Sequence, residues 1–215
     1  MLYLGERADA QTLAQVQAAV AAIEQALGSE LVDLVPSYAS VLILYNPLHS
    51  DRQDITKRVR RALGSLQTKP AVAARPVVLP VYYAAEAGAD LESLAARAEL
   101  SIDEVIALHS ATEYRVYAIG FAPGFAYLGE VHERIAAPRL ATHRARVPRG
   151  SVAIADRQTA VYPSESPGGW NLIGRCPVPM FAPAACPIMP VAVGDSVRFE
   201  PINRARYLAL GGELS

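Results

Sequence analysis

The sequence that decides the fold reads GFAPGFAYLG at residues 120–129, RVPRGSVAIADRQTAVYP at 146–163 and SESPGGWNLIGRCP at 164–177. Glycine and proline bracket short β-type runs here, and they fix turns where the backbone bends sharply or lets another group approach closely. Many short strands with such turns favour a β-barrel or a sandwich. Trp170 follows two glycines, with tyrosine and arginine nearby, which is typical of a pocket with stacking walls and a cationic group.

The composition indicates a folded protein with little net charge. The chain has 215 residues, of which 52% are hydrophobic and 19% charged, and its net charge is −1. A core is therefore easily supplied, and nothing favours nucleic acid as a partner. We expect no signal peptide and no membrane span, and hence a cytoplasmic protein. Cys176 and Cys186 lack CxxC spacing, so we expect two thiols rather than a disulfide.

The first third of the chain predicts a small α/β domain over residues 1–68. Asp9 can cap a helix that runs to about Leu27, since apolar residues recur at helical spacing in the segment that follows Asp9. Strands are expected at residues 31–35 and 40–45, and a second helix at 51–66. That helix carries a run of four basic residues. We favour a solvent-exposed helix face for them over an anion-binding site.

A proline- and alanine-rich segment, residues 68–76, is typical of a linker. Beyond it, we expect a second domain over residues 77–215. Asp90 can cap one short helix, and Ser101 with Glu104 forms a capping box that starts another. The predicted strands lie at residues 77–83, 114–119, 152–155, 159–162 and 197–201. The fold class is therefore α+β, with a β-barrel or sandwich in the second part.

The second part resembles the family that contains the B subunit of 5-oxoprolinase, the kinase inhibitor KipI and subunit 1 of allophanate hydrolase. The motifs quoted above carry the resemblance, together with APR at residues 137–139 and VGDSVRFEPI at 193–202. LVDLVPSYASVLILYNP at residues 31–47 is similar to the family's first domain. The resemblance implies a small N-terminal α/β domain followed by a cyclophilin-like β-barrel.

The sequence holds no complete catalytic set of its own. It has no GxSxG motif, no Walker A motif, and no HxH or HExxH pair among its four histidines. We therefore expect no metal site and no nucleotide site in this chain. The resemblance implies that ATP is used by a complex, so no cofactor is expected here.

His109 is the candidate catalytic residue, because the resembling segment includes it. It is predicted near the end of a helix, where an imidazole can cap carbonyls or pack under the barrel, or can shuttle a proton near neutral pH. Both interpretations stay open.

The candidate substrate-binding residues offer complementary chemistry. An arginine can grip a carboxylate or ureido group through two hydrogen bonds, glutamine can pair with an amide or lactam, and tyrosine can place a hydroxyl at a rim. Tryptophan can form a flat wall, or simply plug the barrel. We predict one pocket lined by Gln158, Trp170 and Arg175 together with Tyr127 or Arg139.

The resemblance implies a role in an ATP-dependent 5-oxoprolinase that converts 5-oxo-L-proline to L-glutamate, with activity only in the presence of 5-oxoprolinase subunits A and C. One alternative is an amide-hydrolysing role on allophanate, with a ureido substrate in the same pocket. Another is a non-catalytic, KipI-like protein that binds a sensor histidine kinase.

Overall fold

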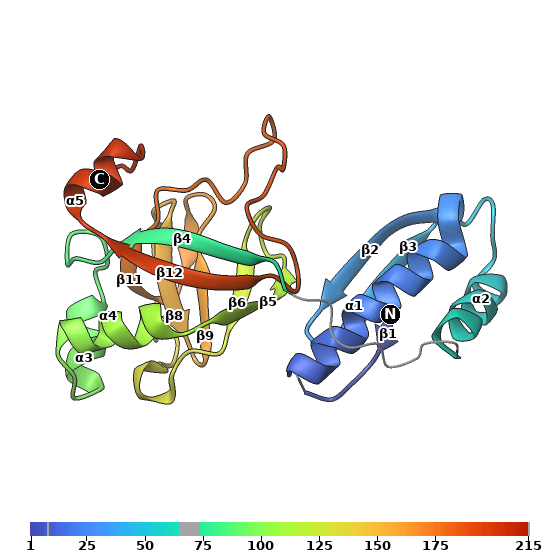
Figure 1. Ribbon diagram of the computed structural model, residues 1–215, viewed down its shortest axis with the longest axis horizontal. Helices are drawn as coiled ribbons and strands as arrows, with labels where there is room; N and C mark the ends of the chain where they lie inside the picture. Colours follow the sequence, from blue (N-terminus) through green and yellow to red (C-terminus); the bar gives the residue numbers. More distant parts are fainter. Residues whose placement is uncertain (8, 65–73, 215) are drawn as a thin grey trace. The chain divides into compact units, whose positions relative to one another are not determined.

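The computed structural model describes residues 1–7, 9–64 and 74–214. The chain groups into two units, Met1–Ala74 and Arg75–Ser215 (Figure 1). Residues 68–73, most of the expected linker, lie outside the described residues. That each unit folds independently stays a prediction.

The N-terminal unit combines two helices with an antiparallel sheet in the order β1-β3-β2. The Asp9 carboxylate accepts a hydrogen bond from the Thr12 amide at 2.7 Å, as expected for the cap of the first helix. Ile23 of that helix and Val59 of the second helix are buried in a common cluster. The elements are β1 (Leu2–Tyr3), α1 (Ala10–Leu27), η1 (Gly28–Glu30), β2 (Leu31–Ser37), β3 (Ser40–Tyr45) and α2 (Arg52–Gly64).

The C-terminal unit is built on a closed seven-stranded barrel within the described residues. Its strands follow the order β5-β12-β4-β11-β8-β9-β6, and β6 pairs back with β5. Strands β4 and β12 are parallel, and the other neighbours are antiparallel. The strands are β4 (Pro76–Tyr82), β5 (Tyr114–Ile119), β6 (Ala126–Gly129), β8 (Ser151–Ala155), β9 (Gln158–Val161), β11 (Asn171–Arg175) and β12 (Ser196–Ile202). The predicted α+β class and barrel are confirmed.

Shorter elements surround the barrel. Helices α3 and α4 lie together beside it, and α4 packs against β12 (Figure 1). The capping box of Ser101 and Glu104 is present at the start of α4, as predicted. Strands β7 and β10 form a separate two-stranded sheet. These elements are α3 (Leu91–Arg97), α4 (Ile102–Ala111), η2 (Glu133–Ile135), β7 (Arg144–Val147), β10 (Ser166–Gly168) and α5 (Arg204–Ala209).

Alternation along the barrel strands gives each of them two distinct faces. Val152, Ile154 and Val161 belong to the main core cluster, whereas Ala153 and Ala160 belong to a second cluster. Since successive strand residues point to opposite faces, the second cluster lies on the outer face of β8, β9 and β11. The alanines on this face leave room for large rings to pack there.

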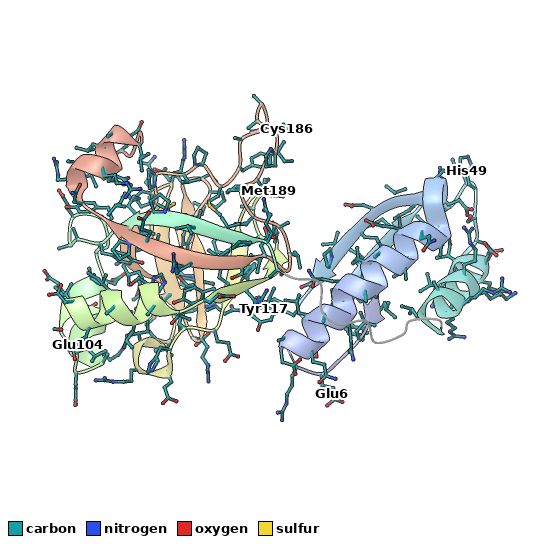
Figure 2. The ribbon with its side chains drawn as sticks, viewed as in Figure 1. Glu6, His49, Glu104, Tyr117, Cys186 and Met189 are labelled. Atoms are coloured by element: carbon teal, nitrogen blue, oxygen red, sulfur yellow. The ribbon has the colours of Figure 1, made fainter. Side chains whose placement is uncertain are left out.

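The two cysteines are free thiols, as expected. Cys176 is buried, and Cys186 is exposed at the tip of a loop (Figure 2). Within the described residues, no helix combines the length and apolar character that a membrane span requires.

Candidate functional site

A cavity of about 320 Å³ lies on the outer face of the barrel. Half of its lining residues are phenylalanine, tyrosine or tryptophan, and the others are an arginine, a histidine and a proline–glycine turn. The lining residues are Phe121, Phe125, Tyr127, Arg139, His143, Tyr162, Pro167, Gly168, Gly169 and Trp170. We call this cavity the aromatic pocket.

Phe125 is the centre of the aromatic wall. Its ring makes edge contacts with Tyr127, Tyr162 and Trp170, at centroid distances of 4.9, 5.3 and 5.7 Å. Such edge-to-face arrangements are favourable and fix ring orientation. Phe125 is only 2% exposed, so it supports the wall from behind. Phe125 is therefore a core residue that also orients the pocket's rings.

Arg139 supplies the positive charge of the pocket. Its guanidinium carbon lies 5.8 Å from the centre of the Trp170 ring, within the range of a cation–π interaction. The Arg139 side chain is exposed, and it is near enough to Tyr127 and Tyr162 to affect both hydroxyls. An anionic group over the Trp170 ring would therefore meet the guanidinium.

The two tyrosines of the pocket keep their protons at neutral pH. Burial raises the pKa of both Tyr127 and Tyr162, and Arg139 offsets only part of this rise. A neutral hydroxyl can both donate and accept a hydrogen bond. The pocket thus combines a flat wall, neutral hydroxyls and one cation, which suits a small planar ligand with a carboxylate.

The glycine pair before Trp170 is required by close contacts. A Cβ atom on Gly168 would overlap the Tyr162 hydroxyl, and one on Gly169 would overlap the His143 imidazole. Neither glycine has a positive φ, so close approach rather than backbone freedom is the reason for glycine here. The same contacts bring His143 to the pocket, a residue that sequence analysis did not place among its site residues.

The loop that carries Arg139 is fastened to the start of β11. The Asn171 side chain donates to the carbonyls of Pro138 and Ile154 at 2.9 and 3.0 Å. The Leu140 amide donates to the Gly169 carbonyl at 2.7 Å. Asn171 is 1% exposed, so these bonds have no competition from water. Sequence analysis missed this positioning residue because its partners are distant in sequence.

Asp90 positions the other side of the pocket. It precedes α3, as predicted, but its side chain makes no cap hydrogen bond. Instead, the carboxylate accepts from the Leu172 amide and from Arg144, both at 2.7 Å. Arg144 lies on β7, whose partner β10 leads into the Gly169–Trp170 turn. In place of the expected local cap, Asp90 therefore forms long-range hydrogen bonds that link the start of α3 to β11 and β7.

The structure brings together three of the predicted site residues, Tyr127, Arg139 and Trp170. Arg175 lines a different cavity, so the expectation that it shares this pocket is wrong. Gln158 lines neither cavity; it lies at the start of β9, opposite Gly129. Arg175 does not reach the aromatic pocket because of distance. It lies at the far end of β11, about 16 Å along the strand from Trp170.

His109 is placed inside the barrel rather than in either cavity. It is 0% exposed, its Nδ1 lies 2.7 Å from the Tyr83 hydroxyl and its Nε2 lies 2.9 Å from the Thr159 hydroxyl. Its ring stacks on Phe199 at 4.6 Å. Burial lowers the pKa of His109 to about 3. Its surroundings match the packed interpretation, and the catalytic role stays a prediction.

No three histidine, cysteine, aspartate or glutamate side chains among the described residues are grouped so as to hold a metal ion.

Known proteins resemble this chain over most of its length. A family profile for the carboxyltransferase domain, subdomain C and D, matches residues 1–191. The B subunit of 5-oxoprolinase from Bacillus subtilis (strain 168) is 38% identical over 97% of this chain and 91% of its own length. The B subunit of 5-oxoprolinase from Escherichia coli O157:H7 is 38% identical over 80% of this chain and 78% of its own length.

Solved structures agree with these relatives. The crystal structure of TTHA0988 matches with a TM-score of 0.83 at 38% identity and covers 94% of this chain, which spans only 39% of the TTHA0988 chain. The uncharacterized protein PH0987 of Pyrococcus horikoshii matches with a TM-score of 0.60 at 40% identity, over 96% of this chain and 94% of its own. Urea carboxylase of Kluyveromyces lactis shares the fold, with a TM-score of 0.75 at 15% identity. The match covers 96% of this chain and 21% of the urea carboxylase chain. The chain therefore belongs to the family of 5-oxoprolinase B subunits and carries subdomains C and D of the carboxyltransferase domain.

Proposed function

We propose that this chain acts within a 5-oxoprolinase complex and that its aromatic pocket binds 5-oxo-L-proline. The name shared by its relatives in Bacillus subtilis and Escherichia coli supports a role in such a complex. The observation that carries the substrate assignment is the pocket itself. A cavity of about 320 Å³ with Trp170 as a wall and Arg139 at 5.8 Å from its ring suits a small flat lactam that bears a carboxylate.

The binding mode follows from the chemistry of the lining. The planar amide of the lactam lies against the part of Trp170 that lines the pocket, and the carboxylate meets the Arg139 guanidinium. The neutral Tyr127 hydroxyl bonds to the lactam, which offers one N–H and one carbonyl oxygen. Binding of this kind positions the ring for reaction without supplying a nucleophile.

The reaction requires the rest of the complex. Water adds across the lactam C–N bond and yields the carboxylate and the ammonium of L-glutamate. An unactivated lactam resists this addition, and ATP, hydrolysed to ADP and phosphate, makes the carbonyl electrophilic by phosphorylating its oxygen. The sequence has no Walker A motif, so ATP binds to the partner subunits A and C in this proposal.

The test is ATP-dependent glutamate formation by the complex reconstituted from this chain and its two partner proteins. Arg139→Lys keeps the charge but loses the planar fork, and we expect kcat/KM to fall about tenfold, which corresponds to roughly 1.4 kcal/mol. Tyr127→Phe keeps the ring and removes the hydroxyl, and a similar loss is expected. Arg157→Lys is the matched control, because Arg157 is exposed and pairs with Glu130 away from the pocket. A complex that opens 5-oxo-L-proline equally well with either pocket variant would refute the assignment.

A further inference from the structure

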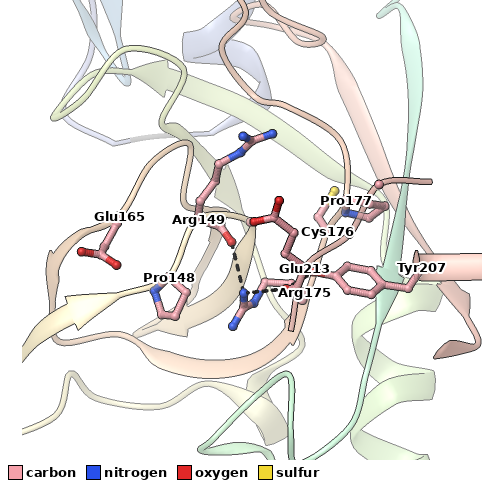
Figure 3. A pocket seen from close by; sticks show the side chains of 11 residues that line it. Pro148, Arg149, Glu165, Arg175, Cys176, Pro177, Tyr207 and Glu213 are labelled. Atoms are coloured by element: carbon pink, nitrogen blue, oxygen red, sulfur yellow. Dashed lines mark hydrogen bonds between the residues drawn. The ribbon is translucent and has the colours of Figure 1, made fainter. Parts of the chain in front are cut away.

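A second cavity, of about 250 Å³, lies at the other end of β11. The turn at Pro148 and Arg149 forms one side of it, and Tyr207 and Glu213 near the C-terminal end form another (Figure 3). The Arg175 guanidinium lies between these two sides (Figure 3). We call this second cavity the Arg175 cavity.

Arg175 is a buried cation without a carboxylate partner among the described residues. Its residue surface is only 6% exposed. Its Nη1 donates to the carbonyls of Arg149 and Glu213 at 3.5 and 3.2 Å, and its Nε is buried with no acceptor. Neutral carbonyls at such distances do not compensate a guanidinium charge that has been removed from water. The geometry therefore leaves a positive charge and one donor unsatisfied.

Arg144, on β7 of the same unit, provides the contrast. It is also partly buried, and one of its nitrogens likewise lacks an acceptor. However, its Nη2 lies 2.7 Å from the Asp90 carboxylate. The fold thus supplies a carboxylate to the partly buried Arg144, whereas Arg175 lines a cavity and forms no ion pair among the described residues.

The other charged groups of the Arg175 cavity define what can enter it. The Glu165 carboxylate forms an ion pair with Arg146, at 3.2 Å, and not with Arg175. Burial raises the pKa of Tyr207, so its hydroxyl stays neutral and donates to the Glu213 carbonyl at 2.9 Å. Two arginines, Arg149 and Arg175, and two glutamates, Glu165 and Glu213, line the cavity, so the lining has no excess positive charge that would favour a multiply charged anion such as phosphate.

We propose that the Arg175 cavity binds a small carboxylate, no larger than an amino acid, through the part of the guanidinium that lines the cavity. A planar carboxylate matches the planar guanidinium fork and neutralises its single charge. The cavity volume admits a molecule of that size. The site is separate from the aromatic pocket and does not depend on the proposed function.

The test observes Arg175 directly in the purified, wild-type chain. The ¹H–¹⁵N signal of the Arg175 Nε group, assigned as the one lost in Arg175→Lys, is followed during titration with 5-oxo-L-proline, L-glutamate or acetate. We expect the signal to move and saturate with at least one of these acids. The neutral amide of the same acid should leave it unmoved. If Arg175→Lys does not fold, correlation from the Arg175 backbone assigns the signal instead.

Two matched variants complete the design. Arg175→Lys should weaken binding of the active acid at least about tenfold by calorimetry, since it loses the fork. Arg139→Gln, in the aromatic pocket, should leave the Arg175 signal shift unchanged. An Arg175 signal that none of the three acids moves at about 20 mM, or that the amide moves equally, would overturn the proposal. Because the readout is binding to the isolated chain, it stands or falls independently of activity in the complex.

Discussion

The buried histidine of the barrel makes a quantitative prediction about acid stability. His109 contacts Tyr83, Thr159 and Phe199 from three different strands or strand ends and has no exposed surface. Its imidazole is neutral in the folded state, because burial lowers its pKa from 6.5 to about 3. In the unfolded chain the imidazole regains an ordinary pKa. Between these two values the unfolded state therefore binds the additional proton.

This difference stabilises the fold above pH 6.5, and the stabilisation is lost as the pH falls toward 3. The loss is about 1.4 kcal/mol per pH unit, so the free energy of unfolding should drop by roughly 2 kcal/mol between pH 7.5 and pH 5. The complete effect approaches about 5 kcal/mol near pH 3. The tyrosines that face His109 do not contribute, since burial raises the pKa of both Tyr83 and Tyr114 above 10.

The assay is urea unfolding followed by fluorescence of Trp170, the only tryptophan, which lies in the barrel unit. His109→Gln is the matched variant, because its amide can still bond to both hydroxyl partners but cannot titrate. Its unfolding free energy should lose roughly 2 kcal/mol less than that of the wild type over the same range. Equal pH slopes for the two proteins would show that His109 is not the buried, neutral group described above.

Three further predictions concern the two sides of the aromatic pocket and the division of the chain, and a fourth concerns the chain alone. Asp90→Asn should lower the free energy of unfolding by about 2–4 kcal/mol in urea titrations, because Arg144 loses its counter-charge; an unchanged midpoint would contradict this. Asn171→Ala should raise KM for 5-oxo-L-proline in the reconstituted complex more than it lowers kcat, since the Arg139 loop loses its anchor. The fragment 75–215, produced alone, should give a cooperative unfolding transition; a gradual, non-cooperative one would count against an independent barrel unit. The purified full chain by itself should neither hydrolyse ATP nor open the lactam, and turnover by contaminant-free protein would contradict this.

Local signals in the sequence predicted the local structure well. Asp9 caps the first helix, and Ser101 with Glu104 forms the expected capping box. These interactions join residues three positions apart, so the sequence pattern contains all of the relevant geometry. The barrel strands with clear β-type runs were found for the same reason. Strands β6 and β11 were not predicted, since β6 has only four residues and the glycine and arginine of β11 conceal its pattern.

The long-range interactions were beyond such signals. Asp90 has the position and chemistry of a helix cap, and nothing in its neighbourhood indicates otherwise. Its partners, Arg144 and Leu172, lie 54 and 82 positions away in sequence. A carboxylate bonds to whichever donors the fold brings to it, and charged donors form the stronger bonds. A cap motif thus predicts a helix start reliably but not the use of its side chain.

The prediction placed Arg175 in the wrong cavity for a geometric reason that the alternation of side chains along a strand does not reveal. Trp170 and Arg175 are five positions apart, and in a regular strand an odd separation would put their side chains on opposite faces. The register of β11 against β8 shifts between Leu172 and Gly174, and such a bulge changes the alternation. Length along the strand then separates the two residues by about 16 Å, which no small ligand spans. One carboxylate cannot contact both Arg139 beside Trp170 and Arg175, so variants of the two arginines should affect separate binding events.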